Sequence, residues 1–296
     1  MHIFANFRNP VSDPYLLYIK EKYNDKPFTI WHEKFPDNVK QLEENPYNFL
    51  FLAEPNELFG LHNIAVSNYN LFTGILTWSE VVLNNCPNGI KLTFNGRVLD
   101  KDYIESIKDK PKLFEVSFLS GRTNYIEGHH LRQRILLLDD QIKIPKKWFE
   151  VLNDYDHSIN VRPGYTSYSK DLSHIPKGVD IVGYGKRVLY NSMFNVVVES
   201  CWQNNWYNKI GDSFLTKCIP VYWGCPNLSE MGYDERGIIR FKNENELINI
   251  LNSLTPEVYE QMKPYIDYNY EVAKLDEEED KVTQFFDEFI KINDIK

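Results

Sequence analysis

The stretch at residues 193–228, MFNVVVESCWQNNWYNKIGDSFLTKCIPVYWGCPNL, decides the fold of this chain. Residues 195–198 form a short apolar, β-branched run, which predicts a strand buried on both faces. Residues 208–217 carry apolar side chains on one helical face, and residues 218–222 form a second buried strand that Gly and Pro residues then end. A strand, a helix and a second strand in this order indicate an α/β domain with a mostly parallel sheet.

Polar side chains follow the first of these strands and open the helix. Glu199 and Ser200 come directly after the strand, and Asn208 and Lys209 begin the helix. In an open parallel sheet, ligands bind outside the carboxyl ends of the strands, near helix N-termini. An ammonium in the first helical turn is unfavourable for the helix dipole, and a bound anion such as phosphate would make it favourable. The sequence therefore leaves two interpretations of Lys209, an anion site or a plain solvated lysine.

Three segments around these residues resemble a known family. VVVES, NWYNKIGD and IPVYWGCPN resemble the donor-binding core of glycosyltransferase family ten, the α-1,3/4-fucosyltransferases. That family has an apolar strand ending in Glu-Asn, then Tyr-x-Thr-Glu-Lys-x-x-Asp, and then Pro-(Val/Ile)-Tyr-(Trp/Leu)-Gly followed by a Pro. The positions that match in register are Glu199, Lys209, Asp212, Pro220, Tyr222, Trp223, Gly224 and Pro226.

Four positions depart from the family pattern. The family has Asn, Tyr, Thr and Glu where this chain has Ser200, Asn205, Tyr207 and Asn208. The family's Glu contacts the ribose of the nucleotide, so Asn208 leaves the identity of the donor open.

The resemblance implies a GT-B fold, in which two Rossmann-like α/β domains face each other across a cleft. It also implies an inverting, metal-independent glycosyltransferase that moves fucose from GDP-fucose to a glycan hydroxyl, with the nucleotide sugar as co-substrate and no cofactor. A glycosyltransferase with another nucleotide-sugar donor and a non-catalytic sugar- or nucleotide-binding module remain the alternatives. The residues that would contact the donor are Arg132, Glu199, Ser200, Tyr207, Asn208 and Lys209.

The candidate for the catalytic base lies in the N-terminal half. Glu54 follows the predicted strand at 48–52, NFLFL, at the edge of the sheet where ligands gather. By the resemblance, Glu54 is the general base that accepts the proton of the acceptor hydroxyl. Glu57 and Glu80 are its nearest rivals, and an ordinary loop carboxylate is the alternative interpretation.

Basic residues gather in the segment at 117–135, SFLSGRTNYIEGHHLRQRI. The family places a phosphate-binding Arg after the first strand of its second domain, in a loop that opens a helix. Arg132 fits that position best by its distance from the following apolar run, and Arg122 is the alternative. A guanidinium suits phosphate because it offers paired planar donors. The GYGKR motif at 183–187 lacks the Ser or Thr of a P-loop and is interpreted as the end of the strand predicted at 179–182. A supporting role of Lys186 or Arg187 near the donor phosphates is the alternative.

Metal ligands and export signals are not expected. The four cysteines lack the paired spacing of a metal site, and the adjacent His129 and His130 do not share a helical face. We interpret the cysteines as reduced thiols. No signal peptide is visible, and no apolar run is long enough for a membrane span. Together these features predict a cytoplasmic protein without a metal site.

The length of 296 residues suits two domains. We expect an N-terminal acceptor-side α/β domain at 1–110, a nucleotide-sugar-binding Rossmann-like domain at 111–275 and a C-terminal helix at 276–296. The charged segment at 101–110 is interpreted as a linker, and 146–152 as a helix. The net charge is −9 and no basic block is present, which argues against nucleic acid as a partner.

Overall fold

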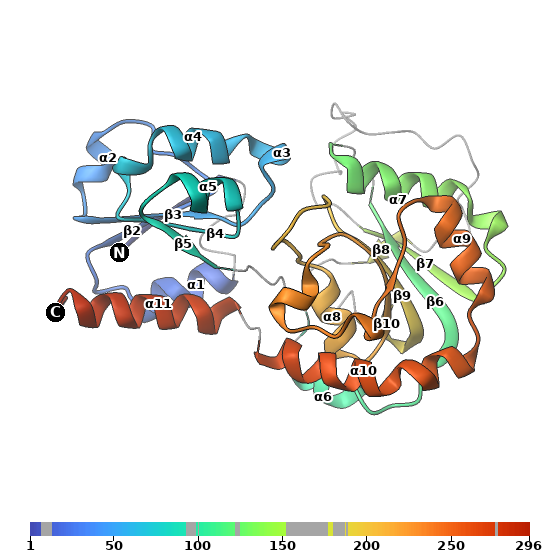
Figure 1. Cartoon of the computed structure of the whole chain (residues 1–296). Helices are drawn as coiled ribbons and strands as arrows, with labels where there is room; N and C mark the ends of the chain where they lie inside the picture. Colours follow the sequence, from blue (N-terminus) through green and yellow to red (C-terminus); the bar gives the residue numbers. More distant parts are fainter. Residues whose placement is uncertain are drawn as a thin grey trace. The chain divides into compact units, whose positions relative to one another are not determined.

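The computed structural model describes residues 1–6, 14–92, 99, 101–121, 125–151, 177–179, 187, 189–275 and 278–296. The chain divides into two compact units (Figure 1). The first comprises Met1–Phe94 together with Glu277–Lys296, and the second comprises Asn95–Asp276. The predicted division at 110 therefore lies at 94, and the C-terminal helix belongs to the first unit. No helix among the described residues is both long enough and apolar enough to span a membrane.

The first unit is built on a parallel sheet in which each strand lies beside its predecessor, in the order β1-β2-β3-β4-β5. The strands are β1 (His2–Ala5), β2 (Phe28–His32), β3 (Tyr47–Leu52), β4 (Gly74–Thr77) and β5 (Gly89–Lys91). The helices among its described residues are α1 (Pro14–Lys22), α2 (Lys40–Glu43), α3 (Asn56–Phe59), α4 (Leu61–Ser67), α5 (Glu80–Asn85) and α11 (Glu278–Ile292). In Figure 1, α1 and α11 lie on one face of the sheet, and α4 and α5 cover the other.

Helix α11 belongs to the first unit because its apolar face completes that unit's core. The Phe286 ring packs against Phe28 and Phe49, with centroids 5.3 and 5.1 Å apart. The Tyr23 hydroxyl of the segment after α1 donates a hydrogen bond to Asp287 at 2.8 Å. An aromatic cluster of this kind contributes both buried area and ring–ring contacts, so the last helix closes the sheet face that β2 and β3 leave apolar.

The second unit holds a parallel sheet whose described strands run in the order β11-β10-β9-β6-β7-β8. They are β6 (Leu113–Ser120), β7 (Lys146–Val151), β8 (Lys177–Val179), β9 (Ser192–Val198), β10 (Ile219–Trp223) and β11 (Ile239–Arg240). The helices among its described residues are α6 (Lys101–Ile107), α7 (Glu127–Leu137), α8 (Ile210–Leu215), α9 (Glu244–Ser253) and α10 (Pro256–Leu275). The chain proceeds outward from β6 to β8 and then returns to the other side of β6 with β9. The prediction of two parallel α/β domains is confirmed.

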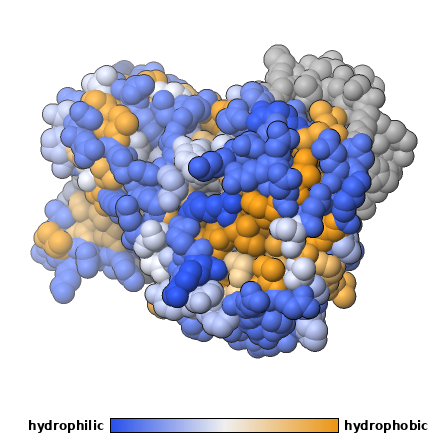
Figure 2. All heavy atoms as spheres, turned by 45° about the vertical axis from the view of Figure 1, so that its right-hand side comes forward, coloured by the Kyte–Doolittle hydropathy of each residue, from blue (hydrophilic) through white to orange (hydrophobic). Residues whose placement is uncertain are grey.

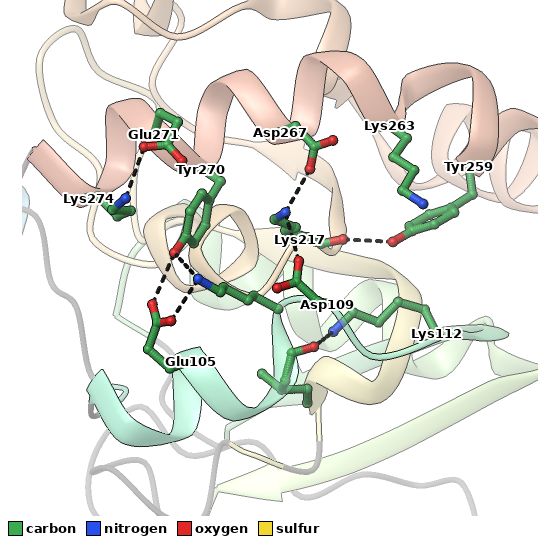
Figure 3. A network of polar contacts seen from close by, with 12 residues as sticks. Glu105, Asp109, Lys112, Lys217, Tyr259, Lys263, Asp267, Tyr270, Glu271 and Lys274 are labelled. Atoms are coloured by element: carbon green, nitrogen blue, oxygen red, sulfur yellow. Dashed lines mark hydrogen bonds and ion pairs between the residues drawn. The ribbon is translucent and has the colours of Figure 1, made fainter.

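The segment at 101–110 differs from its prediction as a linker. It contains helix α6, whose Ile104 and Ile107 are buried in the core of the second unit. Its Glu105 and Lys108 face α10, where the Tyr270 hydroxyl donates to Glu105 at 3.2 Å and the Lys108 ammonium lies 3.3 Å from that hydroxyl (Figure 3). The segment is therefore a packed helix, and a count of charged residues does not detect its two buried isoleucines.

The segment at 146–152 was predicted to be helical, and this prediction is wrong. Residues Lys146–Val151 form β7, which pairs in parallel with β6. The Trp148 ring stacks on Phe118 of β6, with centroids 4.0 Å apart. Aromatic side chains stabilise a strand mainly by packing against a neighbouring strand. Pairing with β6 therefore makes this short run a strand and not a helix.

Candidate functional site

The strand order of the second unit's sheet reverses between β6 and β9. These two strands are neighbours in the sheet although they are not consecutive in the chain. Such a switch point leaves a crevice outside the carboxyl ends of the two strands, where ligands of open α/β sheets bind. Ser120 is the last residue of β6, and Glu199 directly follows β9. The candidate site is built from the residues gathered at this edge.

Glu199 is fully buried and is held by the start of α8. Its Oε1 accepts hydrogen bonds from the backbone N–H groups of Asn208 at 3.2 Å and Lys209 at 3.0 Å. Its Oε2 lies 3.3 Å from the Lys209 ammonium. A carboxylate of the chain itself thus occupies the position at the start of α8 where the sequence suggested a bound anion. An anion site at Lys209 would need to use the outer side of this ion pair.

The Lys209 ammonium lies within one polar network with the other predicted residues of this segment. It donates to Asn208 Oδ1 at 2.7 Å and to Ser200 Oγ at 3.4 Å, and it lies 5.5 Å from the centre of the Trp206 ring. Lys209 keeps 28% of its side chain exposed. The structure thus brings Glu199, Ser200, Asn208 and Lys209 together, with Asn208 and Lys209 as the partly accessible members.

Helix α7 packs its first turn directly onto this segment. The N–H of Gly128 donates to the carbonyl of Ser200 at 3.0 Å. A Cβ at Gly128 would lie 1.8 Å from the carbonyl oxygen of Glu199, so only glycine allows the approach. One turn later, Arg132 Nη1 donates to the carbonyl of Val198 at 3.2 Å. The predicted Arg132 therefore lies at the same sheet edge as Lys209.

His129 adds a neutral group to this positive site. Its Nδ1 accepts the N–H of Tyr125 at 3.3 Å. Burial, together with the positive charges of Arg132 and Lys209, lowers the pKa of His129 to about 3. The imidazole is therefore uncharged at neutral pH, and the positive potential comes from the guanidinium and the ammonium. From the sequence, His129 was a candidate only as a metal ligand, although its place one helical turn before Arg132 was a signal.

Two further features of this edge were not predicted. The Ser120 hydroxyl is buried and has no hydrogen-bond partner among the residues that the structure describes. The Trp202 ring is 40% exposed and packs edge-on against Trp223, with centroids 5.6 Å apart. Figure 2 shows hydrophobic side chains reaching the surface of the molecule among hydrophilic ones. Along the described residues, no group of three or more His, Cys, Asp or Glu side chains is arranged to hold a metal ion.

The loop between β9 and α8 explains one departure from the family pattern. Asn205 is buried with φ of 62°, a left-handed conformation that Asn adopts more readily than Tyr. Its N–H donates to Asn227 Oδ1 at 2.8 Å, which fixes the loop to the end of β10. Tyr207 points into the core and meets Tyr233 edge-on, with centroids 5.9 Å apart. A donor contact of Tyr207 stays a prediction.

The remaining basic candidates lie elsewhere in the sequence or on other parts of the described chain. Arg122 and Lys186 lie outside the described residues. Arg187, which neighbours Lys186, places its guanidinium 4.8 Å from the centre of the Tyr103 ring. Arg134 is exposed and forms ion pairs with glutamates of α7 and α9. Of the arginines on α7, only Arg132 bonds to the end of β9.

In the first unit, Glu54 lies just beyond β3 and is half-buried. Its N–H donates to the carboxylate of Glu33 at 2.7 Å, and its carbonyl oxygen lies 3.1 Å from His62 Nε2. The rivals Glu57 and Glu80 are exposed, in α3 and at the start of α5. The backbone of Glu54 is thus anchored at the carboxyl end of a strand. Glu33, a buried carboxylate beside it, was not a candidate from the sequence.

No protein-family model matches this sequence, and no curated protein matches it either. Solved structures similar to the chain include Anabaena Alr3699/HepE in complex with UDP, at 13% identity and a TM-score of 0.55, over 93% of this chain and 81% of that one. A glycosyltransferase from Rickettsia africae is 12% identical with a TM-score of 0.53, over 97% and 84%. An alpha1,3-fucosyltransferase is 16% identical with a TM-score of 0.47, over 88% and 80%.

At these identities the likeness concerns the fold alone, and a TM-score under 0.5 carries no argument for a family. The expected fold class is confirmed as two Rossmann-like α/β domains of the GT-B type. Membership of the fucosyltransferase family stays a hypothesis.

Proposed function

We propose that this chain is an inverting glycosyltransferase that transfers a sugar from a nucleotide donor to a hydroxyl of a glycan acceptor, with GDP-fucose as the first donor to test. The observation that carries the proposal is the positive group at the switch point of the second unit. The positive charges of Arg132 and Lys209 both lower the pKa of His129 there, and Arg132 bonds to the carboxyl end of β9. The fold, shared with a glycosyltransferase and with a protein that binds UDP, supports the same class of reaction.

In this proposal the donor diphosphate binds over the first turn of α7. Phosphate oxygens replace Asn208 Oδ1 and Ser200 Oγ as partners of the Lys209 ammonium, while Glu199 stays in place beneath it. The guanidinium of Arg132 and the amino end of α7 supply further positive charge. Negative charge grows on the diphosphate as it departs, and preorganised cations stabilise it. The Ser120 hydroxyl is available to donate to the bound donor. No divalent cation is required.

Glu54 is proposed as the general base. The acceptor hydroxyl oxygen forms a bond to the anomeric carbon as the bond from that carbon to the diphosphate breaks, through an oxocarbenium-like state. The proton of the hydroxyl passes to the Glu54 carboxylate, and the electron pair of the broken bond leaves with the diphosphate. Attack from the face opposite the leaving group inverts the anomeric configuration.

A UDP-sugar is the second candidate donor, and Asn208 is the observation that favours it. The family that this chain resembles has Glu at that position, whereas Asn208 directs its carbonyl oxygen to Lys209 at 2.7 Å. The altered nucleotide-facing group is compatible with another nucleotide, and one similar structure contains UDP. A non-catalytic binding module is the remaining alternative. Such a module would bind the diphosphate through the positive group and would not need Glu54 as a base.

Titration calorimetry with GDP and UDP, and donor consumption with GDP-fucose and UDP-sugars in the presence of EDTA, test the proposal. We expect binding of one diphosphate and sugar transfer that survives the chelator. Glu54→Gln should slow transfer by about 10²–10⁴-fold without changing donor affinity. The exposed Glu57→Gln is the matched control. Rescue by manganese after loss in EDTA would exclude the metal-free mechanism, and donor binding without transfer to any glycan would favour the binding module.

A further inference from the structure

Glu33 has an unusual backbone conformation. It is the first residue after β2, its φ is +49°, and its side chain is 1% exposed. The left-handed region is unfavourable for a residue with a Cβ, and Gly or Asn normally occupies it. Such strain persists only where the surrounding structure determines it, and it gathers at functional sites.

The Glu33 carboxylate binds the two residues that follow β3. Its Oε1 accepts the N–H groups of both Ala53 and Glu54, the second at 2.7 Å. The N–H of Glu33 donates to the carbonyl of Phe51 at 3.0 Å, which extends the β2–β3 ladder one residue past His32. The left-handed turn at Glu33 is what allows its side chain to return to the end of β3.

The carbonyl groups of the same two residues are held from the other side. Trp78 Nε1, just after β4, donates to the carbonyl of Ala53 at 2.9 Å. His62 Nε2, in α4, lies 3.1 Å from the carbonyl oxygen of Glu54. Burial lowers the pKa of His62, so the imidazole is neutral, and the proton on Nε2 makes it the donor in this bond. The His62 and Trp78 rings also meet edge-on, with centroids 5.4 Å apart.

We propose that Glu33, His62 and Trp78 are positioning residues that hold the backbone of Glu54, so that its carboxylate meets the acceptor hydroxyl. The inference rests on the proposed function, in which Glu54 is the base. Both N–H groups and both carbonyl groups of residues 53 and 54 bond to these three side chains, which come from three different segments. A general base must lie within hydrogen-bonding distance of the proton that it removes. The left-handed backbone at Glu33 brings its carboxylate to both N–H groups.

The substitution Glu33→Gly separates positioning from stability. It removes the carboxylate, and glycine suits the left-handed backbone, so the unit should melt close to the wild-type temperature. We expect kcat for sugar transfer to fall by about 10²-fold, the effect of a misplacement of roughly 1 Å, while the donor KM and diphosphate affinity stay unchanged. Glu33→Gln keeps an oxygen acceptor and should restore kcat to within a few-fold. Asp294→Gly is the control, because Asp294 is also left-handed, with φ of +50°, but is exposed.

A second readout does not depend on activity. The amide hydrogens of Ala53 and Glu54 should exchange faster in Glu33→Gly than in the wild type, and Glu33→Gln should restore their protection. Wild-type kcat in Glu33→Gly, or a loss that Glu33→Gln does not restore, overturns this inference and leaves the proposed function intact. A wild-type protein that transfers no sugar from any donor overturns the proposed function itself, whatever the amide exchange.

Discussion

Replacing Lys209 by methionine removes the cation beside the fully buried carboxylate of Glu199. The two groups are 3.3 Å apart, and Glu199 also accepts hydrogen bonds from two backbone N–H groups and, at 3.5 Å, from the Tyr222 hydroxyl. Removing one partner of a buried ion pair costs about 3–5 kcal/mol, because the remaining charge stays buried without compensation. Since Lys209 is 28% exposed and the N–H bonds persist, we expect the lower end, about 3 kcal/mol.

This loss corresponds to a fall in melting temperature of about 6–12 °C, because 1 kcal/mol shifts Tm by roughly 2–4 °C for a domain of 150–250 residues. The double variant Glu199→Gln/Lys209→Met removes both charges and keeps an oxygen that accepts both N–H bonds. It should therefore melt above the single variant and close to the wild type. Lys263→Met is the control, because Lys263 and its partner Glu260 are both largely exposed.

Differential scanning calorimetry on the four proteins checks the expectation. A Lys209→Met variant that melts with the Lys263→Met control would refute the reasoning that Lys209 compensates a buried charge. A double variant that melts no higher than the single one would refute it equally. The outcome also decides how Lys209 is tested as a phosphate ligand. If the expectation holds, the double variant is the proper protein for calorimetry with GDP, and a lost charged hydrogen bond should weaken binding by about 10- to 100-fold.

Three other predictions concern helix α7. Arg132→Ala should weaken GDP binding by about 10- to 100-fold in calorimetry, whereas the exposed Arg134→Ala should not, and equal effects would remove Arg132 from the site. Because the pKa of His129 is lowered to about 3, its contribution to stability is present above about pH 6.5 and is lost as the pH falls from there toward 3. A titration by NMR should find this low value in the free protein and a higher one with GDP bound, and a free value near 6.5 would contradict the site. Gly128→Ala would bring its Cβ to 1.8 Å from the Glu199 carbonyl oxygen, so the helix must move. Denaturant unfolding should then register a loss of about 1–3 kcal/mol, and unchanged stability would refute that contact.

Short-range patterns determined the elements of this protein where one physical signal dominated. The run predicted at 195–198 lies in β9, the strand predicted at 218–222 corresponds to β10, and the parallel α/β class is confirmed. Hydrophobic periodicity indicates which face of a segment is buried, and a short continuous apolar run indicates a strand that is buried on both faces. The same local reading placed Glu199 and Lys209 at the carboxyl edge of a strand, where they lie.

Pairings between distant segments were decided only by the tertiary structure. The contact of Gly128 with Ser200, and of Glu33 with Glu54, joins segments that no local period relates to each other. Charge counts likewise missed α6, since its two buried isoleucines become visible only against α10 and its neighbours. Residue types therefore determined which groups this protein can offer to a ligand. The order in which the strands pair decided which of those groups meet, because strand pairing is a long-range choice that the local sequence does not encode.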